Sequence, residues 1–138
     1  CGERPSETVD MLLDNLKNIR PTGPFEINIE GIGGFPDLVR PRVAWAGIRE
    51  DTEHLQAIRN EVEKAALKAS IPKENKKYTP HITVGRRNSN LPLPEKILSS
   101  MESEALVTEP WTVREIILMR SELSPMGPRY TSLGLFKI

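Results

Sequence analysis

The chain has 138 residues, of which 38% are hydrophobic, and its 19 basic and 19 acidic side chains give a formal net charge of zero. This length suits a single domain over residues 1–138 with a real core, and the charge balance gives no overall field that favours long nucleic-acid contacts, membranes or acidic partners. No run of 18 apolar residues is present to span a bilayer, and the single cysteine, Cys1, cannot form an internal disulfide, which fits a cytoplasmic location.

The N-terminal third predicts a helix and then two strands. Ser6 is placed as an N-cap, and before Pro21 apolar residues recur at helical spacing, at Val9, Leu12, Leu13, Leu16 and Ile19. Alternation over 25–30 predicts a half-buried strand, and residues 43–48, apolar on both faces, predict an internal strand. The Gly- and Pro-rich residues 31–36 are interpreted as a plain loop, because they match neither dinucleotide nor P-loop spacing.

The remainder predicts two more helices and three more strands. Asp51 or Thr52 caps a second helix, whose predicted buried stripe consists of Leu55, Ile58, Val62 and either Ala65 or Ala66. Pro94 opens a third helix. Strands are predicted at 81–86, 111–119 and 130–136. The resulting order, α-β-β-α-β-α-β-β, has connections between neighbouring strands of hairpin or near-hairpin length, which predicts an α+β fold with antiparallel pairing.

The segment KKYTPHITVGRR (76–87) carries the most informative chemistry. Residues two apart in a strand share a face, so His81 and Thr83 point the same way and Ile82 and Val84 point into the core. An imidazole transfers protons near neutral pH, and a threonine hydroxyl donates to anionic oxygens. Arg86 follows just beyond, where a cation suits a phosphate group.

The spacing alone leaves a plainer interpretation open, in which His81 is a surface or core histidine. The other histidine, His54, lies in the first turn of the second predicted helix, where a surface or capping role is expected. Two histidines without neighbouring cysteines do not make a zinc site, and no G-x-S-x-G nucleophile elbow occurs. Neither a metal nor a cofactor is therefore predicted.

Three segments together resemble the two-histidine phosphoesterase superfamily, in its branch of 2′-5′ RNA ligases and RNA 2′,3′-cyclic phosphodiesterases. These are PHITVGR (80–86), SELSPMGPRY (121–130) and FEINIEGIGGFPDLVRPRVAWAGI (25–48). The resemblance runs along the whole chain in order. It implies a bilobal fold of antiparallel sheets and flanking helices, with two H-x-[ST] motifs facing each other across a central cleft.

The resemblance also implies a metal-independent activity that opens RNA 2′,3′-cyclic phosphates to 2′-phosphates. The partner would be an RNA with such an end or a small cyclic nucleotide. His81 and Thr83 match the second H-x-[ST] motif and are the expected catalytic residues, and Arg86 is expected to contact phosphate. Ser121 and Tyr130 match a segment near the cleft; a structural role is favoured for both, with Tyr130 as a further substrate-binding candidate.

The sequence departs from the family pattern because it contains no first H-x-[ST] motif. An N-terminal strand, helix and strand carrying that motif are expected to be missing from it. Since acid–base opening of a cyclic phosphate uses two proton-transfer groups, the chain as written is expected to be impaired, with apolar surface uncovered. The alternatives are a homologue that binds RNA ends or nucleotides without turnover, and a structural fragment in which His81 is incidental.

Overall fold

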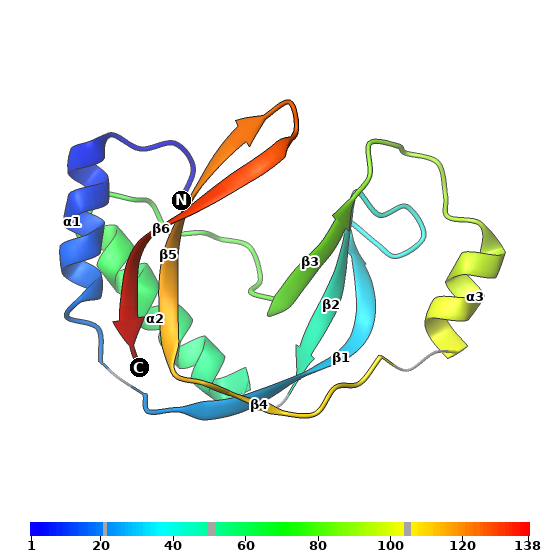
Figure 1. The fold of residues 1–138 in the computed structure, drawn as a ribbon, viewed down its shortest axis with the longest axis horizontal. Helices are drawn as coiled ribbons and strands as arrows, with labels where there is room; N and C mark the ends of the chain where they lie inside the picture. Colours follow the sequence, from blue (N-terminus) through cyan, green and yellow to red (C-terminus); the bar gives the residue numbers. More distant parts are fainter. Residues whose placement is uncertain (21, 50–51, 104–105) are drawn as a thin grey trace. The chain divides into compact units, whose positions relative to one another are not determined.

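The structure is a computed structural model that describes residues 1–20, 22–49, 52–103 and 106–138 (Figure 1). Over these residues the helices are α1 (Ser6–Leu16), α2 (Thr52–Lys68) and α3 (Glu95–Ser103). The strands are β1 (Phe25–Phe35), β2 (Val43–Arg49), β3 (His81–Arg86), β4 (Trp111–Val113), β5 (Glu115–Ser124) and β6 (Gly127–Lys137). The predicted order is confirmed, except that the strand expected at 111–119 is divided between β4 and β5.

The strands form two sheets. One has four strands in the order β3-β2-β1-β4, and the other is the hairpin β5–β6. The pairs β1–β2, β2–β3 and β5–β6 are antiparallel. The connections within β1–β2 and β5–β6 are too short for a parallel crossover, whereas β2 and β3 are joined through α2. This arrangement confirms the predicted α+β class.

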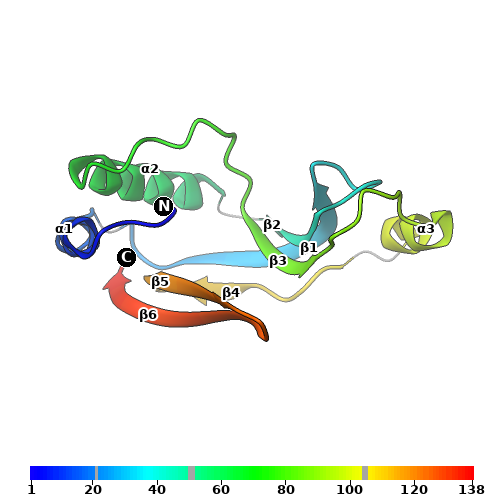
Figure 2. The same cartoon turned by 90° about the horizontal axis from the view of Figure 1, so that it is seen from above.

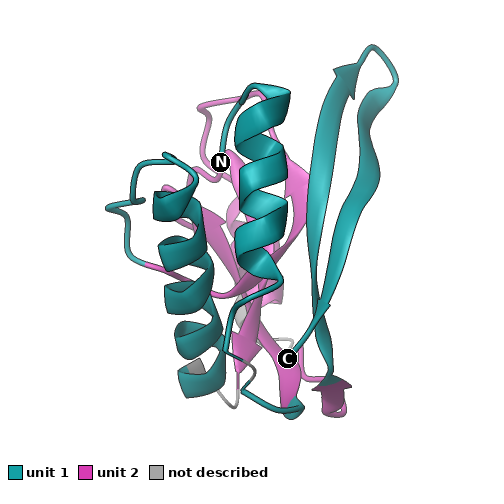
Figure 3. Cartoon of the chain, turned by 90° about the vertical axis from the view of Figure 1, so that its left-hand side faces the viewer, with its two compact units in different colours: residues 1–25, 53–77, 113–138 teal, residues 26–52, 78–112 magenta. Residues whose placement is uncertain are grey.

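The chain divides into two compact units, which Figure 3 distinguishes by colour. Unit 1 comprises residues 1–25, 53–77 and 113–138, and unit 2 comprises residues 26–52 and 78–112. Each unit therefore draws on segments that lie far apart in the sequence. The expectation of a single domain over residues 1–138 stays a prediction.

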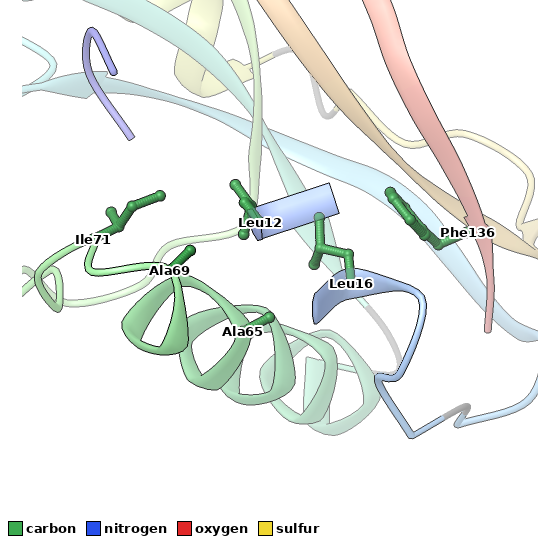
Figure 4. Close-up of a cluster of buried hydrophobic side chains, with 6 residues drawn as sticks. All are labelled: Leu12, Leu16, Ala65, Ala69, Ile71 and Phe136. Atoms are coloured by element: carbon green, nitrogen blue, oxygen red, sulfur yellow. The ribbon is translucent and has the colours of Figure 1, made fainter. Parts of the chain in front are cut away.

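Unit 1 is built around an apolar cluster between its two helices and its hairpin. Both helices lie on one side of β5–β6 (Figure 2). The buried side chains of the cluster, shown in Figure 4, are Leu12, Leu16, Ala65, Ala69, Ile71 and Phe136. Helical spacing places the predicted apolar stripes of α1 and α2 on one face each. Ile116 pairs with Phe136 and also packs against the cluster, so the adjacent pair Ile117 and Leu135 lies on the other face, where both side chains are exposed.

In unit 2 the glycines expected to form a loop lie inside β1, so that prediction is wrong. Gly31 has φ of +77° and lies where the β1–β2 register shifts between Ile29 and Ile32. Such a bulge needs a residue that tolerates positive φ, which glycine does without a Cβ penalty. The strand then continues to Phe35, which pairs with Val43.

The observed helix starts agree with the predicted starts to within one or two residues. Ser6 is the first helical residue of α1, and Pro5 occupies the position expected for Ser6. Pro94 directly precedes α3, and its carbonyl accepts hydrogen bonds from the backbone N–H groups of Ile97 and Leu98. The predicted helix stop at Pro21 and the predicted cap at Asp51 lie outside the described residues.

Candidate active site on strand β3

The candidate residues His81, Thr83 and Arg86 lie on β3, which forms an edge of the four-stranded sheet. All six residues of β3 are exposed. The prediction that Ile82 and Val84 point into the core is therefore wrong, since they are 42% and 65% exposed. An edge strand has a neighbour on one side only, which leaves its side chains less covered than those of β2.

A shift in the β2–β3 register places Arg86 on the same face as His81 and Thr83. Trp45 pairs with Thr83, but Ala44 pairs with Gly85, so Val84 is an extra residue in β3. Strict alternation would have put Gly85, not Arg86, on the face of His81. With the extra residue, Arg86 pairs with Val43; Val43 and Trp45 share a face of β2, and directly opposed residues share a face.

Two aromatic rings surround the imidazole of His81 on this face. The ring of Phe35 lies 5.1 Å from it, centroid to centroid, in an edge-to-face arrangement at 81°. The indole of Trp45 lies 6.0 Å away at 53°, and the Phe35 and Trp45 rings are 5.4 Å apart. We call Phe35 and Trp45 the aromatic pair. Rings at these separations pack favourably and restrict one another's rotation.

The position of Trp45 depends on a glycine in the neighbouring strand. Gly33 pairs with Trp45, and a methyl group added to Gly33 would overlap the indole ring. Among the described residues, the buried Nε1 of Trp45 has no hydrogen-bond partner, so packing holds the ring. Sequence reasoning missed the aromatic pair. The sequence did contain one signal for it, because a glycine inside a strand, here Gly33, often marks a place where another group packs closely against the backbone.

A hydrogen bond fixes which nitrogen of His81 is available for chemistry. Nδ1 lies 2.6 Å from the backbone carbonyl oxygen of Thr79. A carbonyl oxygen only accepts, so Nδ1 carries the proton and donates it. In the neutral ring, Nε2 then has the free lone pair and can accept a proton from an attacking water or hydroxyl group.

A hollow in the described part of unit 2 lies elsewhere. It has a volume of about 260 Å³ and is lined by Ile32, Lys96, Ile97, Ser100 and Met101. Ile32 pairs with Ala46, and by alternation both lie on the sheet face opposite Trp45 and His81. The chemistry-bearing residues therefore lie on an open sheet face and not in this hollow.

The remaining candidates belong to unit 1. His54 stacks on Phe25, with ring centroids 5.2 Å apart and an interplanar angle of 13°. Tyr130 lies on β6, exposed and paired with Ser121, and its substrate-binding role stays a prediction. Across the described ranges, His, Cys, Asp and Glu side chains form no group of three or more that could hold a metal ion, and no helix has the length and apolarity to cross a membrane.

Comparison with known proteins identifies the family. The model of the 2′-5′ RNA ligase superfamily matches residues 2–125, which is most of the chain. The chain belongs to the 2′-5′ RNA ligase superfamily. The predicted resemblance is thus confirmed.

Curated members of this superfamily align over most of the chain. A protein of Aquifex aeolicus named RNA 2′,3′-cyclic phosphodiesterase is 36% identical over 129 residues, which cover 91% of this chain and 67% of that protein. One of the same name from Archaeoglobus fulgidus is 35% identical over 136 residues, covering 99% and 74%. These relatives are named as hydrolases of cyclic phosphodiesters, and the chain spans about two thirds to three quarters of their length.

Solved structures show the same fold. A crystal structure of a Thermus thermophilus protein superposes with a TM-score of 0.72 at 31% identity, covering 99% of this chain and 73% of that one. Escherichia coli LigT, crystallised with 3′-AMP, gives a TM-score of 0.72 at 23% identity and covers 99% and 72%. The fold is therefore the two-histidine phosphoesterase fold of LigT.

Proposed function

We propose that this chain supplies catalytic and phosphate-binding residues for the opening of RNA 2′,3′-cyclic phosphates in the cytoplasm. The product is an RNA with a 2′-phosphate end. The observation that carries the proposal is the placement of His81, Thr83 and Arg86 on one face of β3. A proton-transfer group, a hydroxyl donor and a guanidinium side by side are what a phosphoryl-transfer site requires. The names of the curated relatives support the same reaction.

The reaction needs proton transfers at two oxygens. Water attacks phosphorus, the bond from phosphorus to the 3′-oxygen breaks, and the phosphate stays on the 2′-oxygen. One group takes a proton from the attacking water, and another gives a proton to the departing 3′-oxygen. Nε2 of His81 serves as one of these groups, acting as base in one direction and as acid in the reverse direction. Each such group contributes roughly 10²- to 10⁴-fold to the rate.

The phosphate charge is met by Thr83 and Arg86. The threonine hydroxyl donates one hydrogen bond to a nonbridging oxygen, and the guanidinium can donate two parallel bonds. Along β2, the pairing partners of Thr83 and Arg86 are two residues apart, or roughly 7 Å at the rise of an antiparallel strand. The length of the Arg86 side chain spans this gap, and no metal ion is required by this scheme.

The aromatic pair positions the imidazole. Phe35 and Trp45 limit the rotation of the His81 ring, while the Thr79 carbonyl selects the Nδ1–H tautomer. Together they direct Nε2 away from the backbone and keep the ring from adopting the opposite tautomer. Phe35 and Trp45 are therefore positioning residues, and the catalytic role rests with His81.

A second candidate function follows from the single H-x-T motif of this sequence. With one proton-transfer histidine in place, the chain retains phosphate binding and loses most of the turnover. A protein of this kind would bind RNA ends or nucleotides through Thr83 and Arg86 without consuming them. Such a binding protein would use the same face of β3 as the proposed enzyme, and the two would differ only in the rate of phosphodiester hydrolysis.

The test is to incubate the chain with a short RNA ending in a 2′,3′-cyclic phosphate and to follow the 2′-phosphate by ³¹P NMR. We expect slow turnover, which His81→Ala abolishes and an added N-terminal segment carrying an H-x-T motif raises by roughly 10²-fold or more. His54→Gln is the matched control, because His54 stacks on Phe25 in unit 1, and it leaves the rate unchanged. A rate unaffected by His81→Ala, with the added segment present, would refute the proposal.

A further inference from the structure

The hollow beside α3 has no part in the proposed chemistry. Its volume is about 260 Å³, and its wall from the sheet, Ile32, lies on the face opposite His81. The other lining residues, all on α3, are Lys96, Ile97, Ser100 and Met101. We call this space the α3 hollow. It lies within unit 2, between a strand and a helix of the same unit.

Apolar side chains form most of the wall of the α3 hollow. Ile32, Ile97 and Met101 contribute hydrocarbon surface. On α3 the apolar residues Ile97, Leu98 and Met101 share one side, because residues three or four apart are neighbours on a helix. None of the residues of α3 from 95 to 101 is buried, and Ile97 is 46% exposed. The chain therefore leaves this apolar side partly uncovered, and a hydrocarbon group placed there would remove it from water.

One cation lies beside these apolar walls. Lys96 is exposed, and among the described residues its ammonium group forms no ion pair, whereas Lys17, Lys64 and Lys73 each pair with a carboxylate. The hydroxyl of Ser100 already donates to the backbone carbonyl of Lys96 at 2.9 Å. Lys96 is therefore the side chain of this wall that can meet a negative charge on a ligand.

Hydrogen bonds on both sides of α3 keep the hollow in place. Before the helix, the N–H of Leu93 donates to the carbonyl of Val39 at 2.7 Å. After the helix, the carbonyl of Leu106 accepts a hydrogen bond from the N–H of Gly31 in β1 at 2.8 Å. The segments that flank α3 thus hold it beside β1. A ligand would meet walls that are already formed, which lowers the entropic cost of binding.

The volume of the hollow sets the length of the hydrocarbon group. An apolar protein cavity of about 150 Å³ holds one benzene molecule. In proportion, about 260 Å³ accommodates roughly ten carbon atoms. The hollow is smaller than the sites of about 300–1,000 Å³ that bind drug-sized ligands, so its ligand is a smaller molecule.

We propose that the α3 hollow binds a small amphipathic carboxylate. Its hydrocarbon chain, of up to about ten carbon atoms, packs against Ile32, Ile97 and Met101, and its carboxylate lies beside Lys96. The apolar walls select the chain, and the single ammonium group selects a single negative charge. This inference is independent of the proposed function, because the carboxylate and the RNA end would occupy opposite faces of the sheet.

The four methionines of the chain locate the ligand without any substitution. Met101 lines the hollow, whereas Met11, Met119 and Met126 belong to unit 1. Methionine methyl groups are labelled with ¹³C, and octanoate is added below its micelle concentration. We expect a saturable shift of the Met101 signal and no change in the other three. Equal shifts at the exposed Met119 and Met126 would show general adsorption to apolar surface and overturn the inference.

The dependence on chain length tests the size of the site. Carboxylates from butanoate to dodecanoate are titrated, and the Met101 signal reports their affinities. Affinity should rise by up to about fourfold for each buried methylene group and stop rising at roughly ten carbon atoms. An affinity that does not depend on chain length, or that rises equally through dodecanoate, would contradict binding in a hollow of this size.

The role of Lys96 is tested against a neutral ligand. Octanol has the same hydrocarbon chain without the charge, so the ratio of octanoate affinity to octanol affinity isolates the carboxylate. Lys96→Gln should lower this ratio roughly two- to fivefold at low salt, the value of an exposed ion pair, and by less at high salt. Octanol binding itself should not change.

Lys68→Gln is the matched control, because Lys68 is an exposed lysine of α2 in unit 1, and it should leave the ratio unchanged. An unchanged ratio in Lys96→Gln, or an equal fall in both variants, would overturn the placement of the carboxylate beside Lys96.

Discussion

The two units of the chain differ in where they place their apolar side chains. Among the described residues, all the buried hydrophobic ones lie in unit 1 except Ile27 and Ala46. Unit 2 instead exposes the whole of β3 and carries His81, Thr83 and Arg86 there. Packing energy is thus concentrated in the helices and hairpin of unit 1, and the proposed chemistry is concentrated on an open sheet edge in unit 2.

This difference determines which amino-acid substitutions each unit can tolerate. A buried cluster responds to the loss of a few methylene groups, because close-packed neighbours cannot relax to fill the space. An exposed edge strand accepts polar and charged side chains at little cost, so residues there can be chosen for chemistry. Substitutions in the two units should therefore separate stability from phosphate binding.

The largest expected effect is in the core of unit 1. Phe136→Ala should lower the free energy of unfolding by about 3–5 kcal/mol, because Phe136 is buried against α1 and α2. The matched control is Leu135→Ala, whose side chain is 52% exposed on the opposite face and whose loss should cost less than about 1 kcal/mol. Urea unfolding measures both. Similar losses for the two variants would contradict the assignment of the core.

The next effect lies in unit 2 and links packing to the site. Gly33→Ala places a methyl group in the Trp45 ring, and such overpacking costs about 1–3 kcal/mol. The substitution should also displace the His81 ring, so that both tautomers of the imidazole become populated. The ¹⁵N chemical shifts of the two ring nitrogens measure this change. Gly85→Ala is the control, since no heavy atom lies within 4 Å of the added methyl group. If both variants kept the His81 shifts of the parent chain, the aromatic pair would not position the ring.

The smallest effect concerns the surface of unit 1. Nζ of Lys17 and Oδ1 of Asp14 are 2.7 Å apart, and both side chains are mostly exposed. Lys17→Gln should change the free energy of unfolding by less than about 0.5 kcal/mol, because solvent screens such pairs. A thermal melt at low and high salt measures the change. A loss comparable to that of Phe136→Ala would mean that surface charge, and not apolar packing, stabilises unit 1.

Much of this architecture could be predicted from residue patterns. The helical spacing from Val9 to Leu16 predicts α1, and the alternation of Phe25, Ile27 and Ile29 predicts the start of β1. Hydrophobic periodicity is a local property, so it can be recognised in one sequence. The placement of His81 and Thr83 on one face follows from the alternation of side chains along a strand.

Features that depend on contacts between strands could not be predicted. Gly33 suggests a loop in the sequence because the contact that requires a glycine there, with the indole of Trp45, is made by a residue on another strand. The extra residue Val84 leaves no mark in the local pattern, yet it decides that Arg86 and not Gly85 shares the face of His81. Register shifts depend on the partner strand, which sequence periodicity does not reveal.

The most direct test of the central claim uses the fact that the chain has only two histidines. Ring signals of His81 and His54 are followed by NMR while a 2′-phosphorylated nucleotide is added. We expect saturable shifts at His81, little change at His54, and weaker binding in Thr83→Ala and Arg86→Gln. Shifts at neither histidine, or equal shifts at both, would contradict the assignment of the β3 face as the phosphate site.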